Sequence, residues 1–213
     1  MKSILGLLAL ALSVACGHES RRAAPDTTSA GTQAMAVGQS DSLPVSGEDA
    51  CAKKLPSTLI DQLKARFPHH RVPVSSDNEP WAVSSDRRSG GDGCLGIAKG
   101  DFDGDGTIDF VVLLSPLADT ISPLIVARGD SQTYRLDSLQ VSTGPRRIFY
   151  VSALAPGRYK RTNILSDDSV ALEPGEVAVF ESSRPGLVTG ALEDGSVAFF
   201  YDGRRWVHVW LSD

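Results

Sequence analysis

The fold class of this chain is decided by residues 198–211, which read AFFYDGRRWVHVWL. Two runs of aromatic and β-branched residues flank Asp202-Gly203, and such a dipeptide between two such runs is the strongest short-range signal of a β-hairpin. Because side chains alternate between the two faces of a strand, Trp206, His208 and Trp210 are expected to share one face and the intervening valines the other. The stretch therefore predicts an antiparallel sheet.

Similar short segments recur upstream of this hairpin. They are separated by Gly, Pro, Asp and Ser, as strands are by turns. The predicted strands are Cys94–Lys99, Thr107–Leu114, Pro123–Arg128, Thr133–Leu139, Arg147–Leu154, Val170–Glu173, Val177–Glu181, Ser196–Tyr201 and Arg205–Leu211. Arg128-Gly129-Asp130-Ser131 is expected to be the turn of a second hairpin.

One helix is predicted before the strands, over Thr58–Phe67, with Ser57 as its N-cap and an apolar face that includes Leu59 and Leu63. Residues 74–92 are polar and rich in Gly and Ser, with Trp81 as the one strong anchor. The predicted fold class is α+β and mostly β, with a largely antiparallel sheet, one N-terminal helix and a DxDxDGxxD loop between strands.

That loop, Asp101–Asp109, is the most informative stretch for function, because it holds aspartates at positions one, three, five and nine. Carboxylates this close repel one another, and a bound cation relieves the repulsion. Ca²⁺ takes six to eight oxygens at ~2.3–2.6 Å, whereas Mg²⁺ demands a tight octahedron. The predicted Ca²⁺ ligands are Asp101, Asp103, Asp105, Asp109 and the backbone carbonyl of Thr107. The alternative is a solvated Asp-Gly turn.

An EF-hand does not fit this loop, since its twelfth position is Val112 instead of Glu and the flanking segments are typical of strands. The run Lys99–Gly106, followed by Ile108–Val112, resembles the calcium loop of FG-GAP and VCBS-type repeats. In that family the ligands are the aspartates that correspond to Asp101, Asp103, Asp105 and Asp109.

The sequence holds a single copy of the loop, whereas these repeats usually build a propeller of at least four blades. The chain therefore looks more like small secreted proteins with one VCBS-type loop. The resemblance covers residues 51–213, through Phe67-Pro68, Cys94 and the aromatic end from Trp206 to Asp213. It implies no particular activity.

The N-terminus indicates export. Lys2 precedes an apolar run, Ile4–Val14, which is shorter than the ~20 residues of a membrane-spanning helix. Ser13-Val14-Ala15-Cys16 resembles a bacterial lipobox, which implies a signal peptide over residues 1–15 and a diacylglycerol on Cys16. An ordinary signal peptide is the alternative. Gly17 follows the cysteine in place of an inner-membrane retention aspartate, which favours the outer membrane.

Residues 16–50 are predicted to be the lipidated cysteine and a flexible tether, because they are polar and carry no apolar periodicity. Residues 51–213 are the predicted mostly-β domain. Its two cysteines, Cys51 and Cys94, are expected to form a disulfide in an oxidising compartment, with two free thiols as the alternative. The net charge of −5 argues against a nucleic-acid partner.

The sequence therefore predicts a non-enzymatic, calcium-binding envelope lipoprotein, attached to the membrane by its lipid. One alternative is a protein- or glycan-binding surface module that uses the face of Trp206 and Trp210. The other is a hydrolase: the chain has no G-x-S-x-G or H-E-x-x-H motif, but convergent triads leave no local trace.

Overall fold

The computed structural model describes residues 49–118, 121–130, 133–143, 146–162 and 170–212. The predicted signal peptide, the predicted lipid attachment site Cys16 and nearly all of the predicted tether lie outside these ranges. Within them, no helix is both long and apolar enough to cross a membrane. The predicted class, α+β and mostly β with antiparallel pairing, is confirmed.

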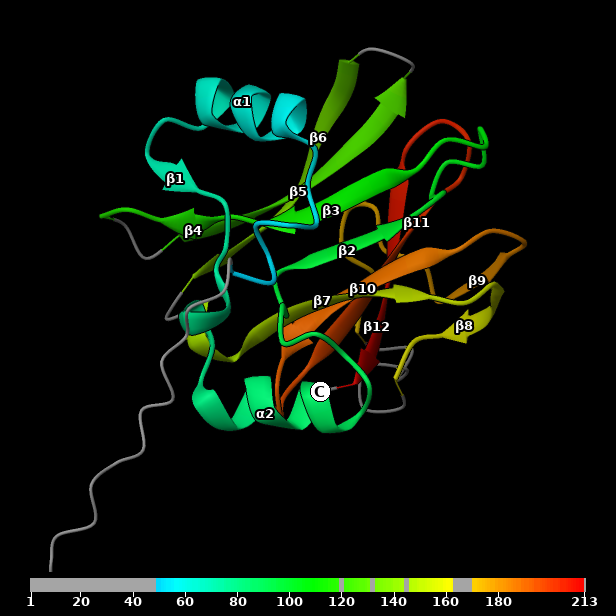
Figure 1. Ribbon diagram of the computed structural model, residues 1–213. Helices are drawn as coiled ribbons and strands as arrows, with labels where there is room; N and C mark the ends of the chain where they lie inside the picture. Colours follow the sequence, from blue (N-terminus) through cyan, green and yellow to red (C-terminus); the bar gives the residue numbers. More distant parts are fainter. Residues whose placement is uncertain (1–48, 119–120, 131–132, 144–145, 163–169, 213) are drawn as a thin grey trace, which may run out of the picture. The chain divides into compact units, whose positions relative to one another are not determined.

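Helix α1 (Ser57–Arg66) lies across one face of a sheet and buries Leu59 and Leu63 there, as its apolar periodicity predicts (Figure 1). The predicted cap is wrong in detail. Ser57 is the first helical residue, the N-cap is Pro56, and no side chain caps the end.

A second helix, α2 (Pro80–Arg88), was not predicted. Proline at the first helical position suits a helix start, because its missing N–H would have no intrahelical partner there. The helix buries only Ala82 and Val83, and Trp81 is 47% exposed, so Trp81 is not an anchor. The start of α2 is held instead by Asn78, whose side-chain amide donates to the carbonyl of Phe149 at 2.8 Å.

Strands make up most of the described chain. They are β1 (His70–Arg71), β2 (Ile97–Gly100), β3 (Asp109–Leu113), β4 (Ser115–Pro116), β5 (Ile121–Asp130), β6 (Thr133–Thr143), β7 (Phe149–Leu154), β8 (Gly157–Lys160), β9 (Val179–Ser182), β10 (Gly186–Ala191), β11 (Ser196–Tyr201) and β12 (Trp206–Ser212). Short 3₁₀ turns occupy Ser75–Asp77 and Arg146–Ile148.

The strands form two four-stranded antiparallel sheets, ordered β2-β3-β5-β6 and β12-β11-β10-β7. Two short pairs, β1-β4 and β8-β9, complete the described strands. The hairpin at Asp202-Gly203 is confirmed, with Tyr201 opposite Trp206. The other hairpin joins β5 to β6 through residues 131–132, so Arg128 and Gly129 lie in β5 and not in its turn.

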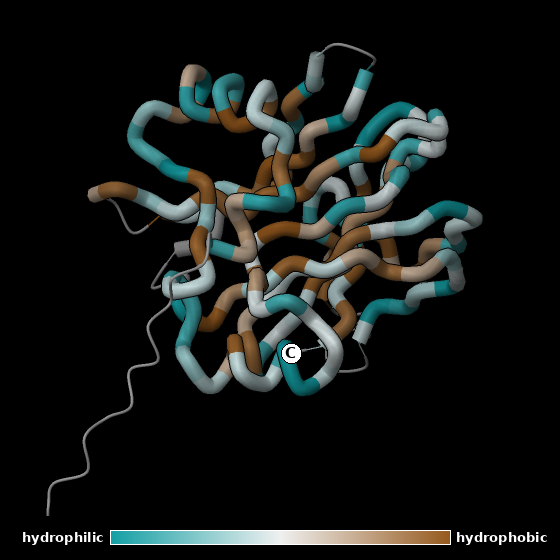
Figure 2. The backbone as a smooth tube through the Cα atoms, in the orientation of Figure 1, coloured by the Kyte–Doolittle hydropathy of each residue, from teal (hydrophilic) through white to brown (hydrophobic). Residues whose placement is uncertain are grey.

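Three apolar layers hold these elements together. Alternate residues of β3 face opposite ways: Phe110 and Val112 pack towards α1, and Val111 and Leu113 pack towards the second sheet. A third cluster covers the outer face of β11 and β12, where the β8-β9 pair packs. Figure 2 shows hydrophobic residues concentrated along the central strands and hydrophilic residues at the turns.

Strand β12 lies at the edge of its sheet, and residues 175–177 run beside it. The N–H of Val177 donates to the carbonyl of His208, and the N–H of His208 donates to the carbonyl of Gly175. A buried ion pair between Arg161 and Glu176, 2.6 Å apart, fixes this segment. The predicted strand Val170–Glu173 is wrong, because those residues pair with no strand in the described part of the chain.

Strand β10 was missed because its sequence, GLVTGA, contains two glycines, which weaken a strand signal. The fold requires both. A Cβ on Gly186 would lie 2.3 Å from the ring of Phe200, and one on Gly190 would lie 2.4 Å from the carbonyl oxygen of Gly195.

Candidate metal centre

The acidic loop connects β2 to β3, as the sequence predicts. These strands pair antiparallel, with Gly100 opposite Asp109, so the two ends of the loop are adjacent. Between them the chain turns sharply at Gly104 and Gly106, which have φ of +79° and +86°. Such a backbone is open to glycine and strained for most other residues.

Three of the predicted ligands converge. Asp101, Asp103 and Asp109 each offer a carboxylate oxygen, and these oxygens lie within 4.8 Å of one another. It is the one such cluster of acidic, histidine or cysteine side chains in the part of the chain that the structure describes. The structure does not bring Asp105 into this group, and Thr107 was expected to contribute only its carbonyl.

Asp109 is fully buried, and backbone N–H groups hold both of its oxygens. One oxygen accepts from Phe102 at 2.9 Å, and the other accepts from Gly129 of β5 at 2.9 Å. Burial raises the pKa of Asp109 to about 6; the hydrogen bonds from Gly129 and Phe102 oppose this rise, and the negative charge of Asp103 adds to it. The ionised form is therefore strained by desolvation and eased by any nearby positive charge.

The other aspartates bond to the backbone of the loop itself. Asp101 accepts from the N–H groups of Gly104 at 2.7 Å and Gly106 at 3.0 Å. Asp105 accepts from the N–H of Thr107 at 2.7 Å. These bonds curl the loop around Asp101, and because a carboxylate oxygen has two lone pairs, its bonded oxygens can still bind a cation.

Two arginines approach Asp103, and sequence reasoning missed both. Arg128 of β5 lies 3.4 Å from a carboxylate oxygen of Asp103. Arg184, in the turn between β9 and β10, donates to the main-chain carbonyl of Asp103. The repulsion among the aspartates is thus partly offset within the protein. Arg128 was predicted only as the end of a strand next to a turn, and nothing in the sequence near Arg184 links Arg184 to the loop.

The predicted disulfide is present. Cys51 and Cys94 form a disulfide, as predicted, with their Cα atoms 5.1 Å apart. The folded part includes Asp49 and Ala50, which the sequence assigned to the tether: Asp49 accepts hydrogen bonds from the N–H groups of Cys51 and Ser75, both at 2.9 Å.

Comparisons with known protein families, curated proteins and solved structures find no match to this chain.

Proposed function

We propose that this chain is a calcium-binding envelope lipoprotein without enzymatic activity, in which the ion stabilises the β2-loop-β3 unit. The observation that carries the proposal is the convergence of Asp101, Asp103 and Asp109. The lipid anchor and the envelope location rest on the sequence around Cys16 alone.

The donor chemistry fits calcium. All three converging groups are carboxylates, the hard oxygen ligands that Ca²⁺ prefers. Asp109 is anchored to β5 through Gly129, so an ion bound to Asp109 would tie the loop to three neighbouring strands. A cation would also relieve the desolvation of the Asp109 carboxylate. Asp105 and the carbonyl of Thr107 remain the predicted further ligands.

Calcium should raise the melting temperature, because a ligand that binds only the native state stabilises it by mass action. With a Kd of ~10⁻⁴–10⁻³ M, as in extracellular modules, ~5 mM calcium contributes roughly 1–2 kcal/mol. For a domain of this size that corresponds to a rise of roughly 2–8 °C. The measurement is a melting scan in chelator and in calcium.

Three variants that each replace one aspartate by asparagine sharpen the test. Asp103→Asn keeps the shape of the side chain but removes a converging charge, and it should abolish the calcium shift. Asp61→Asn removes an exposed carboxylate on α1 and should leave the shift intact. Asp105→Asn should lower affinity less than Asp103→Asn. The proposal is refuted if calcium does not change the melting temperature of the wild type, or if it raises that of Asp103→Asn by the same amount as that of the wild type.

A further inference from the structure

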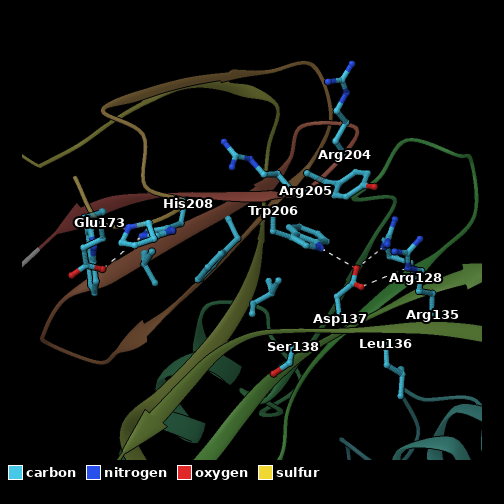
Figure 3. Close-up of a pocket in the computed structure, with 17 residues that line it drawn as sticks. Arg128, Arg135, Leu136, Asp137, Ser138, Glu173, Arg204, Arg205, Trp206 and His208 are labelled. Atoms are coloured by element: carbon cyan, nitrogen blue, oxygen red, sulfur yellow. Dashed lines mark hydrogen bonds and ion pairs between the residues drawn. The ribbon is translucent and has the colours of Figure 1, made fainter. Parts of the chain in front are cut away.

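A hollow of about 620 Å³ opens between the edge strands of the two sheets, β6 and β12. Its volume lies within the range of small-molecule sites, roughly 300–1,000 Å³. Strand β11, Arg128 of β5, the segment that begins at Glu173 and the turn between β11 and β12 complete its wall (Figure 3). The hollow is separate from the converging aspartates, and Arg128 is the one described residue that lines the hollow and also pairs with a converging aspartate.

One wall of the hollow is aromatic. Trp206, His208 and Trp210 project from the same face of β12, as the alternation of the sequence predicts, and all three are half-buried. The indole N–H of Trp206 donates to Asp137 of β6 at 3.1 Å. The ring of His208 lies 5.6 Å from that of Phe199. The wall is therefore held in place before any ligand arrives, which lowers the entropy cost of binding.

The charges around the hollow are mixed but mainly positive. Its lining carries four arginines and two carboxylates, a balance of +2 in a chain of −5: Arg128, Arg135, Arg204, Arg205, Asp137 and Glu173. The arginines differ in their exposure. Arg128 is buried, bonded to Asp137 at 2.8 Å and stacked 4.6 Å from the centre of the Tyr201 ring. The side chains of Arg135 and Arg205 are 76% and 72% exposed; each lies 3.8 Å from a carboxylate, Asp137 and Asp202 respectively, and its remaining guanidinium donors are accessible to a ligand.

From this arrangement we infer that the hollow binds a saccharide that carries a carboxylate, such as a uronic-acid oligosaccharide. A sugar ring presents an apolar C–H face, which packs on flat indoles. Its hydroxyls both donate and accept hydrogen bonds, which matches a lining with carboxylates as well as arginines. The sugar carboxylate pairs with Arg205 at the rim, where Arg135 is also exposed.

The same charges argue against a phosphate ligand. A nucleotide would stack equally well on indole rings, and its phosphate would suit arginine. However, a phosphate dianion inside the hollow would also face Asp137 and Glu173, which repel it, whereas hydroxyl groups donate to these carboxylates. The carboxylates of a uronic-acid oligosaccharide lie on separate sugar rings, so one can meet the exposed arginines at the rim while none has to enter between the acidic side chains.

The test is a titration of the purified protein with trigalacturonate, followed by tryptophan fluorescence and calorimetry. Maltotriose, adenosine monophosphate and an acidic tripeptide serve as comparison probes. Trigalacturonate should bind most tightly and should change the fluorescence. Binding should be at least about tenfold weaker in Trp210→Ala, as for the truncation of a central aromatic contact. Trp81→Phe, which removes an exposed indole on α2, should bind like the wild type.

Arg205→Gln keeps the test valid if the tryptophan variant does not fold, because this side chain is exposed. It should weaken trigalacturonate binding several-fold and leave any maltotriose binding unchanged. The inference is overturned if trigalacturonate does not bind at millimolar concentration, or if maltotriose, the nucleotide or the peptide binds equally well. It is also overturned if Arg205→Gln, or a folded Trp210→Ala, leaves trigalacturonate affinity unchanged.

Discussion

Removal of the disulfide should cost this domain a large part of its stability. The bond joins Cys51 to Cys94 over a separation of 43 residues, and it closes a loop that contains α1, α2 and β1. In the chain-entropy treatment of an unfolded polypeptide, closing a loop of this size stabilises the native state by ~4 kcal/mol. For a domain of this size that free energy corresponds to a change in melting temperature of roughly 8–16 °C.

The variant to measure is Cys51→Ala with Cys94→Ala, since a single substitution would leave a buried thiol that can react. Urea unfolding followed by circular dichroism gives the free energy directly, and the wild type in reducing agent should resemble the double variant. Cys16→Ser keeps the bridge and should unfold like the wild type. A double variant within ~1 kcal/mol of the wild type would show that loop entropy does not account for the bond's effect.

Three further predictions concern buried charge and close packing. Glu176→Ala leaves Arg161 buried without its ionic partner, so it should lower the free energy of unfolding by ~3–5 kcal/mol in a urea titration. The control is Glu79→Ala, which breaks a more exposed ion pair and should cost less than ~1 kcal/mol. Calcium affinity should fall as pH drops through about 6, because Asp109 must lose its proton to bind, and calorimetry at two pH values measures this. In chelator the stability of the protein should depend on pH with the opposite sign. The folded-state pKa of Asp109 lies above the usual 3.8, so this group favours folding at low pH, and that contribution is lost as the pH rises from about 4 to about 6. Gly186→Ala should destabilise β10 by ~1–3 kcal/mol through overlap with an aromatic ring, whereas Gly157→Ala, which meets only ordinary contacts, should be nearly neutral in thermal melting.

Local spacing accounts for what sequence reasoning predicted correctly. The alternation in residues 206–210 placed the two indoles on one face and the valines on the other, and the structure has them so. Asp101 and Asp109 were expected to meet as ligands of one cation in a loop between two strands, and the pairing of β2 with β3 brings the two ends of that loop together. These features depend on neighbours within about ten residues of one another.

Long-range contacts account for what it missed. Arg184 reaches Asp103 across 81 positions of sequence, and no local pattern encodes such a contact. The strand was predicted to end at Arg128 because Gly-Asp-Ser follows it, although the strand continues to Asp130. Helix α2 is short and mostly polar, so its apolar periodicity is too weak to detect; the contact of Asn78 with β7 fixes its start.

Arg128 can couple binding at the two proposed sites, because it contacts an acidic side chain of each. Its guanidinium lies 3.4 Å from Asp103 and 2.8 Å from Asp137, so a ligand that shifts it towards one carboxylate draws it from the other. If calcium alters the affinity of the hollow by some factor, an occupant of the hollow must alter calcium affinity by that same factor. Reciprocity of this kind would let the surrounding calcium concentration set how firmly the protein holds its ligand.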